Sequence, residues 1–230
     1  MIPSCCRICH HWPSAVLCGD CLSRFAPTTH RCTRCALPLP SFPGNAPDIC
    51  GHCLLHPGPL SHCLAAVDYG YPWDRLITRL KFHEDTALAA QFAPLLHRLP
   101  HAQQLLQSCD ALIPMPLSAQ RLRERGFNQA GLLARSLSPG KIRHDILLRV
   151  LHTRAQSECT LAERMNNVRH AFAVQPGQQS QAQDRHFVLV DDVMTTGASL
   201  THAAQVLLQA GARQVSAIVL ARTPSQSESH

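Results

Sequence analysis

The chain has 230 residues, a formal charge of +6 and a hydrophobic fraction of 45%, which is ordinary for a globular protein with one substantial domain and a small one. No run of eighteen apolar residues occurs, so membrane insertion is excluded from the expected functions, and the N-terminus lacks the pattern of a secretion signal. The basic charge suits a phosphorylated ligand or a nucleic acid, although net charge alone identifies neither.

Eight of the twelve cysteines form four C-x-x-C pairs near the N-terminus: Cys6/Cys9, Cys18/Cys21, Cys32/Cys35 and Cys50/Cys53. Each pair puts two thiolates on one side of a tight turn, and two pairs make a closed tetrahedral zinc site. Without a secretion signal this spacing favours metal over disulfides, and without a strand–helix context it argues against a redox pair. We expect residues 1–58 to be a double zinc ribbon, folded mainly by two structural Zn²⁺ ions.

Two details of these metal sites stay open. Pairing of consecutive C-x-x-C pairs keeps each ribbon local and is preferred, but an interleaved pairing of the first pair with the third is the alternative. His10, His11 and His52 could each replace a cysteine ligand, and Cys5 could replace Cys6.

The segment Pro57–Pro59 marks the boundary to a second domain, residues 59–222. Residues 64–69 predict a strand, residues 73–82 a helix whose apolar side chains recur on one face, and residues 85–99 a second apolar helix. Lys81 ends the first helix. It is either a solvated lysine, the common case, or a contact to a phosphate group.

A second buried strand is predicted at residues 110–113, followed by a turn at 114–117, a basic segment at 121–129 and a helix that continues through Leu137. Basic side chains just past the carboxyl end of a strand lie where α/β sheets bind ligands, and guanidinium groups suit a pyrophosphate. For Arg121 and Arg123 a solvated helix face is the favoured interpretation. The segment Arg125–Gln129 is a stronger candidate because a glycine interrupts it between polar side chains.

Three later segments have few apolar residues. Residues 149–172, which include Gln156 and Arg164, predict a mobile flap, and the glutamine-rich residues 175–185 predict a solvated loop. Residues 223–230 are expected to be a disordered tail.

The strongest pattern begins with an apolar run at residues 187–190, which predicts a buried strand. Two acids end this strand, and a turn then leads into a helix with one apolar face. The acids and the turn residues are Asp191, Asp192, Thr195, Thr196, Gly197, Ala198 and Ser199. A strand at 215–220 completes a βαβ unit. The first turn of a helix offers free N–H groups to an anion, hydroxyls add donors, and Gly197 permits close approach, so a phosphate fits there. The carboxylates can accept hydrogen bonds from a ribose diol or help to hold Mg²⁺. A sugar phosphate satisfies both parts.

This loop closely resembles the signature of the type I phosphoribosyltransferases, which bind 5-phosphoribosyl-1-pyrophosphate (PRPP). The cysteine pairs, the Ile113-Pro-Met-Pro and Arg125-Gly-Phe-Asn-Gln stretches, and Gln156 with Arg164 extend the resemblance to the ComF/GntX family. It implies an α/β fold of the type I phosphoribosyltransferase kind, a parallel sheet flanked by helices, preceded by the double zinc ribbon. It also implies a cytoplasmic role in competence or in the utilization of extracellular DNA.

The resemblance implies that the two acids hold the ribose hydroxyls of PRPP–Mg²⁺ and that the turn holds the 5′-phosphate. The expected pyrophosphate and flexible-loop residues are Lys81, Pro114, Met115, Pro116, Leu117, Arg125, Gly126, Asn128, Gln129, Gln156 and Arg164. Phosphoribosyl transfer is the implied reaction, but no acceptor can be read from the sequence, so a purine, a pyrimidine or an amide stays open.

The alternative is an inactive module of the same fold that binds nucleotides or single-stranded DNA, or that contacts DNA-uptake proteins. Single-strand binders usually offer aromatic platforms, and this chain is only 5% aromatic. Trp73, Phe82 and Phe127 are the candidates, and core packing is the favoured interpretation for each.

Overall fold

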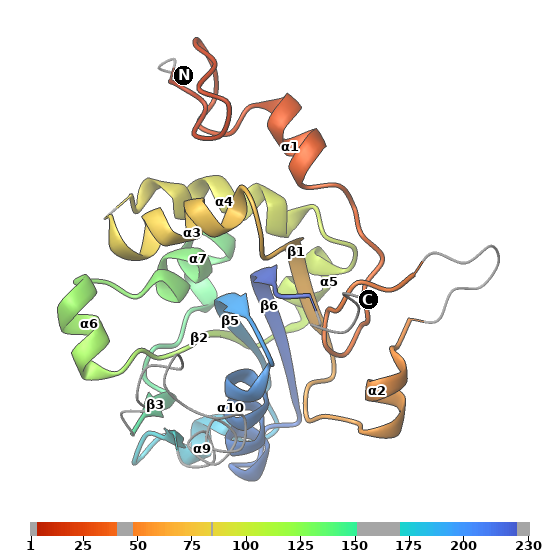
Figure 1. Cartoon of the computed structure of the whole chain (residues 1–230). Helices are drawn as coiled ribbons and strands as arrows, with labels where there is room; N and C mark the ends of the chain where they lie inside the picture. The colour runs from red at the N-terminus through yellow and green to blue at the C-terminus, as the bar shows by residue number, and fades with distance from the viewer. Residues whose placement is uncertain (1–3, 41–47, 84, 151–170, 225–230) are drawn as a thin grey trace.

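A computed structural model of the chain describes residues 4–40, 48–83, 85–150 and 171–224. A parallel β-sheet with helices on both faces forms its centre, and the two cysteine-rich segments border it at different places (Figure 1). This arrangement confirms the expected fold class. None of the helices in the described ranges is long and apolar enough to cross a membrane.

The central sheet has the strand order β1-β6-β5-β2, and every neighbouring pair is parallel. Its strands are β1 (Cys63–Asp68), β2 (Ala111–Pro114), β5 (His186–Met194) and β6 (Gln214–Arg222). Helices cover both faces, so the inner strands are apolar along most of their length. The carboxyl ends of all four strands therefore meet at one edge of the sheet.

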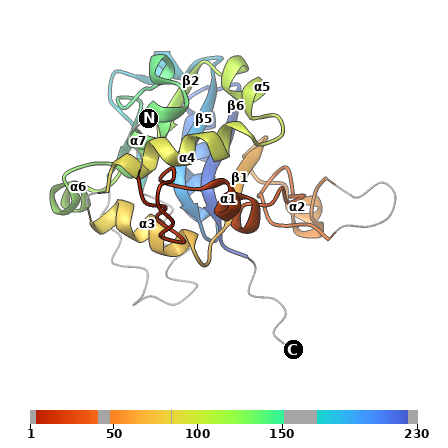
Figure 2. The same cartoon turned by 90° about the horizontal axis from the view of Figure 1, so that it is seen from above.

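Side-chain alternation along β5 divides the core into two halves. Val188 and Val190 pack with the helices of one face, and Phe187 and Leu189 pack with the helix of the other. The first face carries α3 (Trp73–Phe82), α4 (Ala87–His97), α5 (Ala102–Ser108) and α7 (Gln129–Leu137), and the second carries α10 (Ala198–Gln209). Figure 2 shows α3 and α4 lying across the sheet.

The strand before the paired acids does not end where the sequence predicts. It continues through Asp191 and Asp192 to Met194, because β6 supplies parallel partners as far as Arg222. The N–H of Thr223 also donates to the Met194 carbonyl oxygen (3.0 Å). Of the expected disordered tail, residues 225–230 lie outside the described residues.

The smaller elements border the sheet. They are α6 (Ala119–Arg125), the 3₁₀ turn η1 (Pro139–Lys141), the antiparallel pair β3 (Leu147–Arg149) and β4 (Phe172–Val174), and α9 (Gln179–Ala182). The last of these corrects the prediction of a plain solvated loop over residues 175–185. Ala182 is fully buried in the core half around α10, and this contact anchors a short helix.

The two cysteine-rich segments pack on the central domain rather than standing apart. The first contains α1 (Gly19–Phe25), and its buried Ile8 and Leu17 join the core half around α3 and α4. Trp73 Nε1 donates to the Phe25 carbonyl oxygen (2.7 Å). The second contains α2 (Gly51–Leu55) and is held at the sheet edge. There Arg31 forms an ion pair with Asp68 of β1 (2.7 Å).

Candidate functional site

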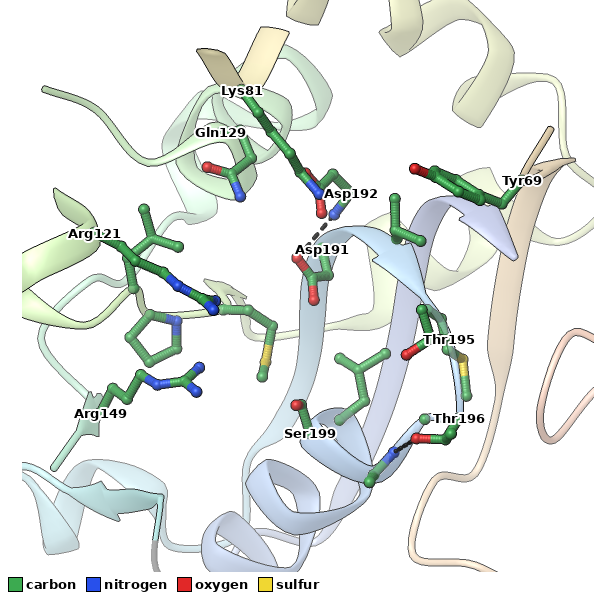
Figure 3. Close-up of a pocket in the computed structure, with 18 of the residues that line it drawn as sticks. Tyr69, Lys81, Arg121, Gln129, Arg149, Asp191, Asp192, Thr195, Thr196 and Ser199 are labelled. Carbon is green, nitrogen blue, oxygen red and sulfur yellow. Dashed lines mark hydrogen bonds and ion pairs between the residues drawn. The ribbon is translucent and has the colours of Figure 1, made fainter. Parts of the chain in front are cut away.

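A cavity of about 300 Å³ opens at the carboxyl edge of the sheet. Its walls come from the ends of β1 and β5, the last turn of α3, the loop after β2, the helices α6 and α7, and the start of α10 (Figure 3). In open parallel sheets this edge is where ligands bind. The two acids and the Thr195–Ser199 turn line the same cavity, as the sequence predicts.

The two acids are in different environments. Because side chains alternate along a strand, Asp192 turns to the side of α3, where it is 3% exposed and its Oδ2 lies 2.9 Å from Lys81 Nζ. Asp191 turns into the cavity, and its Oδ1 accepts a hydrogen bond from the Asp192 N–H (2.9 Å) (Figure 3). Lys81 therefore compensates Asp192, and Asp191 keeps an oxygen available to a ligand.

Burial, together with the charge of Asp192 beside it, raises the pKa of Asp191 to about 8. Removal of a carboxylate from water disfavours its charged form, and a second carboxylate adds to this effect. Asp191 is therefore protonated more readily than an ordinary aspartate. A perturbed acid in a cavity is typical of functional sites.

The turn at Thr195–Ser199 is built for close approach to its backbone. Gly197 is the N-cap of α10 with φ +83°, a conformation that suits glycine, and Thr196 Oγ1 accepts from the Ala198 N–H (3.3 Å). A Cβ atom on Gly197 would collide with Cε of Met194, which lies beneath the turn. The first turn of α10 faces the cavity, where its N–H groups and dipole favour an anion.

The opposite wall of the cavity is basic. Arg121, Arg125 and Arg149 line it, and Arg125 Nη1 donates to Gln129 Oε1 (3.2 Å). Arg125 and Arg149 are both half-buried, and this partial removal from water lowers the pKa of each guanidinium group. Charges attract an anion more strongly in such surroundings. With Asp192 compensated by Lys81, three guanidinium groups face one carboxyl group, so the cavity is net positive.

Most of the predicted loop residues reach this cavity: Lys81, Met115, Pro116, Leu117, Arg125 and Gln129 all line it. Pro114, Gly126 and Asn128 do not appear in the described lining. Asn128 instead holds the wall in place, because its Oδ1 caps α7 at Ala130 N and its Nδ2 donates to the Met115 carbonyl oxygen (both 3.0 Å). Gly126 ends α6 with φ +74°. Gln156 and Arg164 lie outside the described residues.

Sequence reasoning missed three polar lining residues. Arg121 was expected to be solvated, and Tyr69 and Arg149 were not considered as contacts. The position of Tyr69 at the end of the first predicted strand could have indicated it, since strand ends meet at this edge. No sequence signal marks Arg149, which depends on the short β3–β4 pair.

The three aromatic residues considered as stacking platforms for single-stranded DNA differ in burial. Trp73 is buried and Phe127 packs partly buried against the same core half, as expected. Phe82 is 63% exposed, so the expectation of core packing is wrong for it. The Arg125 guanidinium lies over its ring at 4.8 Å from the centroid, which satisfies the cation without burying the ring.

The eight cysteines form two four-sulfur groups, and both use consecutive pairs. The members are Cys6, Cys9, Cys18 and Cys21 in the first cluster and Cys32, Cys35, Cys50 and Cys53 in the second. This grouping confirms the preferred sequential pairing. No histidine completes either cluster of the described chain, and the Cys5 thiol instead points at the His10 carbonyl oxygen (3.1 Å).

The sulfur geometry is compatible with structural zinc. A tetrahedral site with Zn–S bonds of ~2.3 Å has sulfur–sulfur edges of ~3.8 Å. Cys9 Sγ lies 3.7 Å from Cys18 Sγ, and Cys35 Sγ lies 3.7 Å from Cys50 Sγ. Burial raises the pKa of Cys6, but N–H groups of Cys9 and Cys18 outweigh it and lower this pKa to about 6. Such a thiol is ready to bind metal at neutral pH.

Known proteins resemble this chain in sequence. A family model described as a phosphoribosyl transferase domain matches residues 123–230. DNA utilization protein YhgH of Escherichia coli O6:H1 is 34% identical over 235 residues, 96% of this chain and 98% of that protein. Competence protein F of Haemophilus influenzae is 29% identical, over 94% and 95% of the two chains. Competence protein ComFC of Bacillus subtilis is 39% identical over 113 residues, 49% and 44%.

The two acids should have opposite effects on stability. The raised pKa of Asp191 means that stability falls as the pH rises from about 4 to about 8, because the folded protein must hold a proton that the unfolded chain has lost. Asp191→Asn should therefore increase the free energy of unfolding by about 1–3 kcal/mol at pH 8, and by progressively less toward pH 4. Urea unfolding across this pH range measures the difference. A gain that does not depend on pH would contradict the assignment.

Asp192→Asn is the matched comparison. It leaves the Lys81 ammonium without its carboxylate at a site where the lysine side chain is 22% exposed. We expect a loss of about 1–3 kcal/mol in the same unfolding measurement. Equal effects of the two substitutions would show that the acids are not divided as described.

Proposed function

Because this chain belongs to the ComF family and carries a phosphoribosyl transferase domain, we propose that its cavity binds PRPP together with Mg²⁺. One observation supports this most directly: a helix N-terminus with threonine hydroxyls, a cavity-facing carboxylate and a basic wall surround one space. A sugar with a phosphate at one end and a pyrophosphate at the other has matching chemistry at each of the three. We infer that phosphoribosyl transfer is the reaction this site would support.

The proposed pose follows from the wall chemistry. The Thr195–Ser199 turn would hold the 5′-phosphate through its N–H groups and hydroxyls. Asp191 would accept hydrogen bonds from the ribose hydroxyls, with Asp192 fixing the position of Lys81 beside it. Arg125, Lys81 and the Met115–Leu117 loop would face the pyrophosphate. Guanidinium groups suit this end because they bind phosphate oxygens in pairs.

The residues also fit the metal that the fold family implies. Carboxylate oxygen is the ligand type that Mg²⁺ prefers, and Asp191 directs such a group into the cavity. When bound with PRPP, Mg²⁺ would neutralise part of the pyrophosphate charge. The protein's own contribution is to orient the sugar, to stabilise the departing pyrophosphate with the basic wall, and to exclude water from the anomeric carbon.

The biological role that we propose rests on the names of the related proteins. Proteins named for DNA utilization and for competence match this chain over nearly its whole length, so a role in the use of extracellular DNA is the simplest inference. The second candidate is a module that binds nucleotides or single-stranded DNA without turnover. The basic wall favours it, and release of pyrophosphate from PRPP in the presence of a base distinguishes the two.

We also propose that both cysteine clusters hold structural zinc. Each cluster is complete with four sulfurs and so leaves no position for a substrate. The cysteine-rich segments contribute few apolar side chains to the core, and metal binding would supply the missing folding free energy.

The proposed ligand is tested by calorimetric titration of PRPP–Mg²⁺. Asp191→Asn should weaken binding by about 1.5–3 kcal/mol, because the bound sugar and Mg²⁺ favour the ionised carboxylate of Asp191, which a neutral amide cannot replace. Asp184→Asn is the control, because this aspartate has an 84% exposed side chain and pairs with Arg213 away from the cavity. Identical titrations for wild type and Asp191→Asn would refute the assigned pose. Binding of single-stranded DNA but not PRPP would favour the module.

Adjacent cysteines provide a matched test of the zinc sites. Cys6 belongs to the first cluster and Cys5 does not. Purified wild type and Cys5→Ser should each contain two zinc ions per chain, and Cys6→Ser should contain one. Elemental analysis measures this content directly. Two ions retained in Cys6→Ser would remove Cys6 from the ligand set.

A further inference from the structure

Arg222 is a buried cation at the end of β6 whose side-chain hydrogen bonds all go to main-chain oxygens, in two distant segments and in the next residue, Thr223. It is 6% exposed, and Nε donates to the Cys35 carbonyl oxygen (2.9 Å). Nη1 donates to the carbonyl oxygens of Met194 (3.2 Å), Thr195 and Thr223 (2.7 Å). One guanidinium group thus connects the second cysteine cluster to the start of the Thr195–Ser199 turn.

The contacts around this group extend the connection. Cys63 Sγ lies 3.5 Å from Met194 Sδ, and Met194 in turn lies beneath Gly197. The main-chain N–H of Cys63 donates to the Thr33 carbonyl oxygen (2.7 Å), within the C-x-x-C pair that begins the second cluster. A small set of packed groups therefore joins that cluster to the residues under the turn.

The positive charge of Arg222 lies beside the second cysteine cluster, which would be negative with zinc bound. A zinc ion with four thiolates carries a net charge of about −2, because each thiolate contributes one negative charge to a divalent cation. Cys35 belongs to such a cluster, and its carbonyl oxygen is within hydrogen-bonding distance of the guanidinium group. A buried arginine costs free energy unless charge and hydrogen bonds compensate it. The loaded second cluster would supply the charge, and the turn carbonyls supply hydrogen bonds.

The first cluster has no comparable link among the described residues. It packs on the α3 and α4 side, where Arg7 lies 3.7 Å from Asp85 and Trp73 donates to Phe25. The chain therefore contains two sites of the same chemistry, only one of which touches the turn. This difference provides an internal control.

We propose that Arg222 is a positioning residue that couples metal occupancy of the second cysteine cluster to the conformation of the Thr195–Ser199 turn. The coupling rests on the proposed function only in that the turn is taken to hold the ligand's phosphate. Since coupling between two sites is reciprocal, a phosphate ligand on the turn would also slow metal loss from the second cluster.

The first test needs no ligand. Hydrogen exchange of the main chain over residues 194–200 is measured in the full-length protein and in Cys53→Ser and Cys21→Ser, which remove one ligand from the second and the first cluster. Exchange in this segment should become about tenfold faster in Cys53→Ser and stay near the wild-type rate in Cys21→Ser. Equal acceleration, or none, overturns the coupling.

The second test addresses Arg222 itself. Arg222→Lys keeps a positive charge but cannot bridge the carbonyls of Cys35 and of Met194–Thr195 at once, so it should accelerate exchange over 194–200 while retaining both zinc ions. Arg31→Met is the control, because Arg31 ties the same segment to Asp68 without touching the turn. Wild-type exchange in Arg222→Lys, or equal effects of Arg222→Lys and Arg31→Met, would show that Arg222 has no specific part.

The third test measures the reverse effect, of the ligand on metal loss. It uses the wild-type protein, so it does not require that any variant folds. A chelator removes zinc with and without saturating PRPP–Mg²⁺, and one of the two release phases should slow by about fivefold or more. If PRPP binds and both phases are unchanged, the coupling fails although the proposed function stands. If PRPP does not bind but the exchange results hold, the proposed function fails and the coupling stands.

Discussion

The ion pair between Lys81 and Asp192 determines how the rest of the site is organised. Two adjacent carboxylates at the end of one strand would repel each other, and a strand places them on opposite faces. The lysine at the end of α3 compensates the buried acid at 2.9 Å, so the charge of Asp192 is held inside the domain. Asp191 is left in the cavity without a cation of its own, in the part of the chain that the structure describes. The site therefore keeps one acid for structure and one for a ligand.

Much of this could be predicted from the sequence. The main strands and helices, the α10 turn and the cysteine clusters follow from local patterns, because each is encoded within a short stretch of the sequence. The division of labour between the two acids could not be predicted, since it depends on a lysine more than a hundred positions away. For the same reason the sequence did not predict Tyr69 and Arg149 as site residues, because each reaches the cavity only through tertiary packing. Core packing was wrongly predicted for Phe82, because an apolar residue at a helix end can stay exposed and contact a guanidinium group instead.

The cysteine-rich segments illustrate a different limit. The cysteine spacing predicted the two four-cysteine clusters, but it does not show where each cluster packs on the central domain. The first cluster joins the core half around α3 and α4, and the second borders β1 and the turn that begins α10. Because one cluster packs on a face of the sheet and the other at its edge, two sites of the same chemistry lie in different positions relative to the cavity. Arg222, an unremarkable residue at the end of a strand in the sequence, acquires its importance only from that placement.

The contact between Gly197 and Met194 has a consequence for how the chain can diverge. Gly197 has a left-handed backbone, and any Cβ there would meet the terminal methyl group of Met194. A change at either position therefore alters what the other can accept. The flexible end of Met194 could move aside for a Cβ atom, but the left-handed backbone would strain any other residue at 197, so we expect position 194 to vary more freely than position 197.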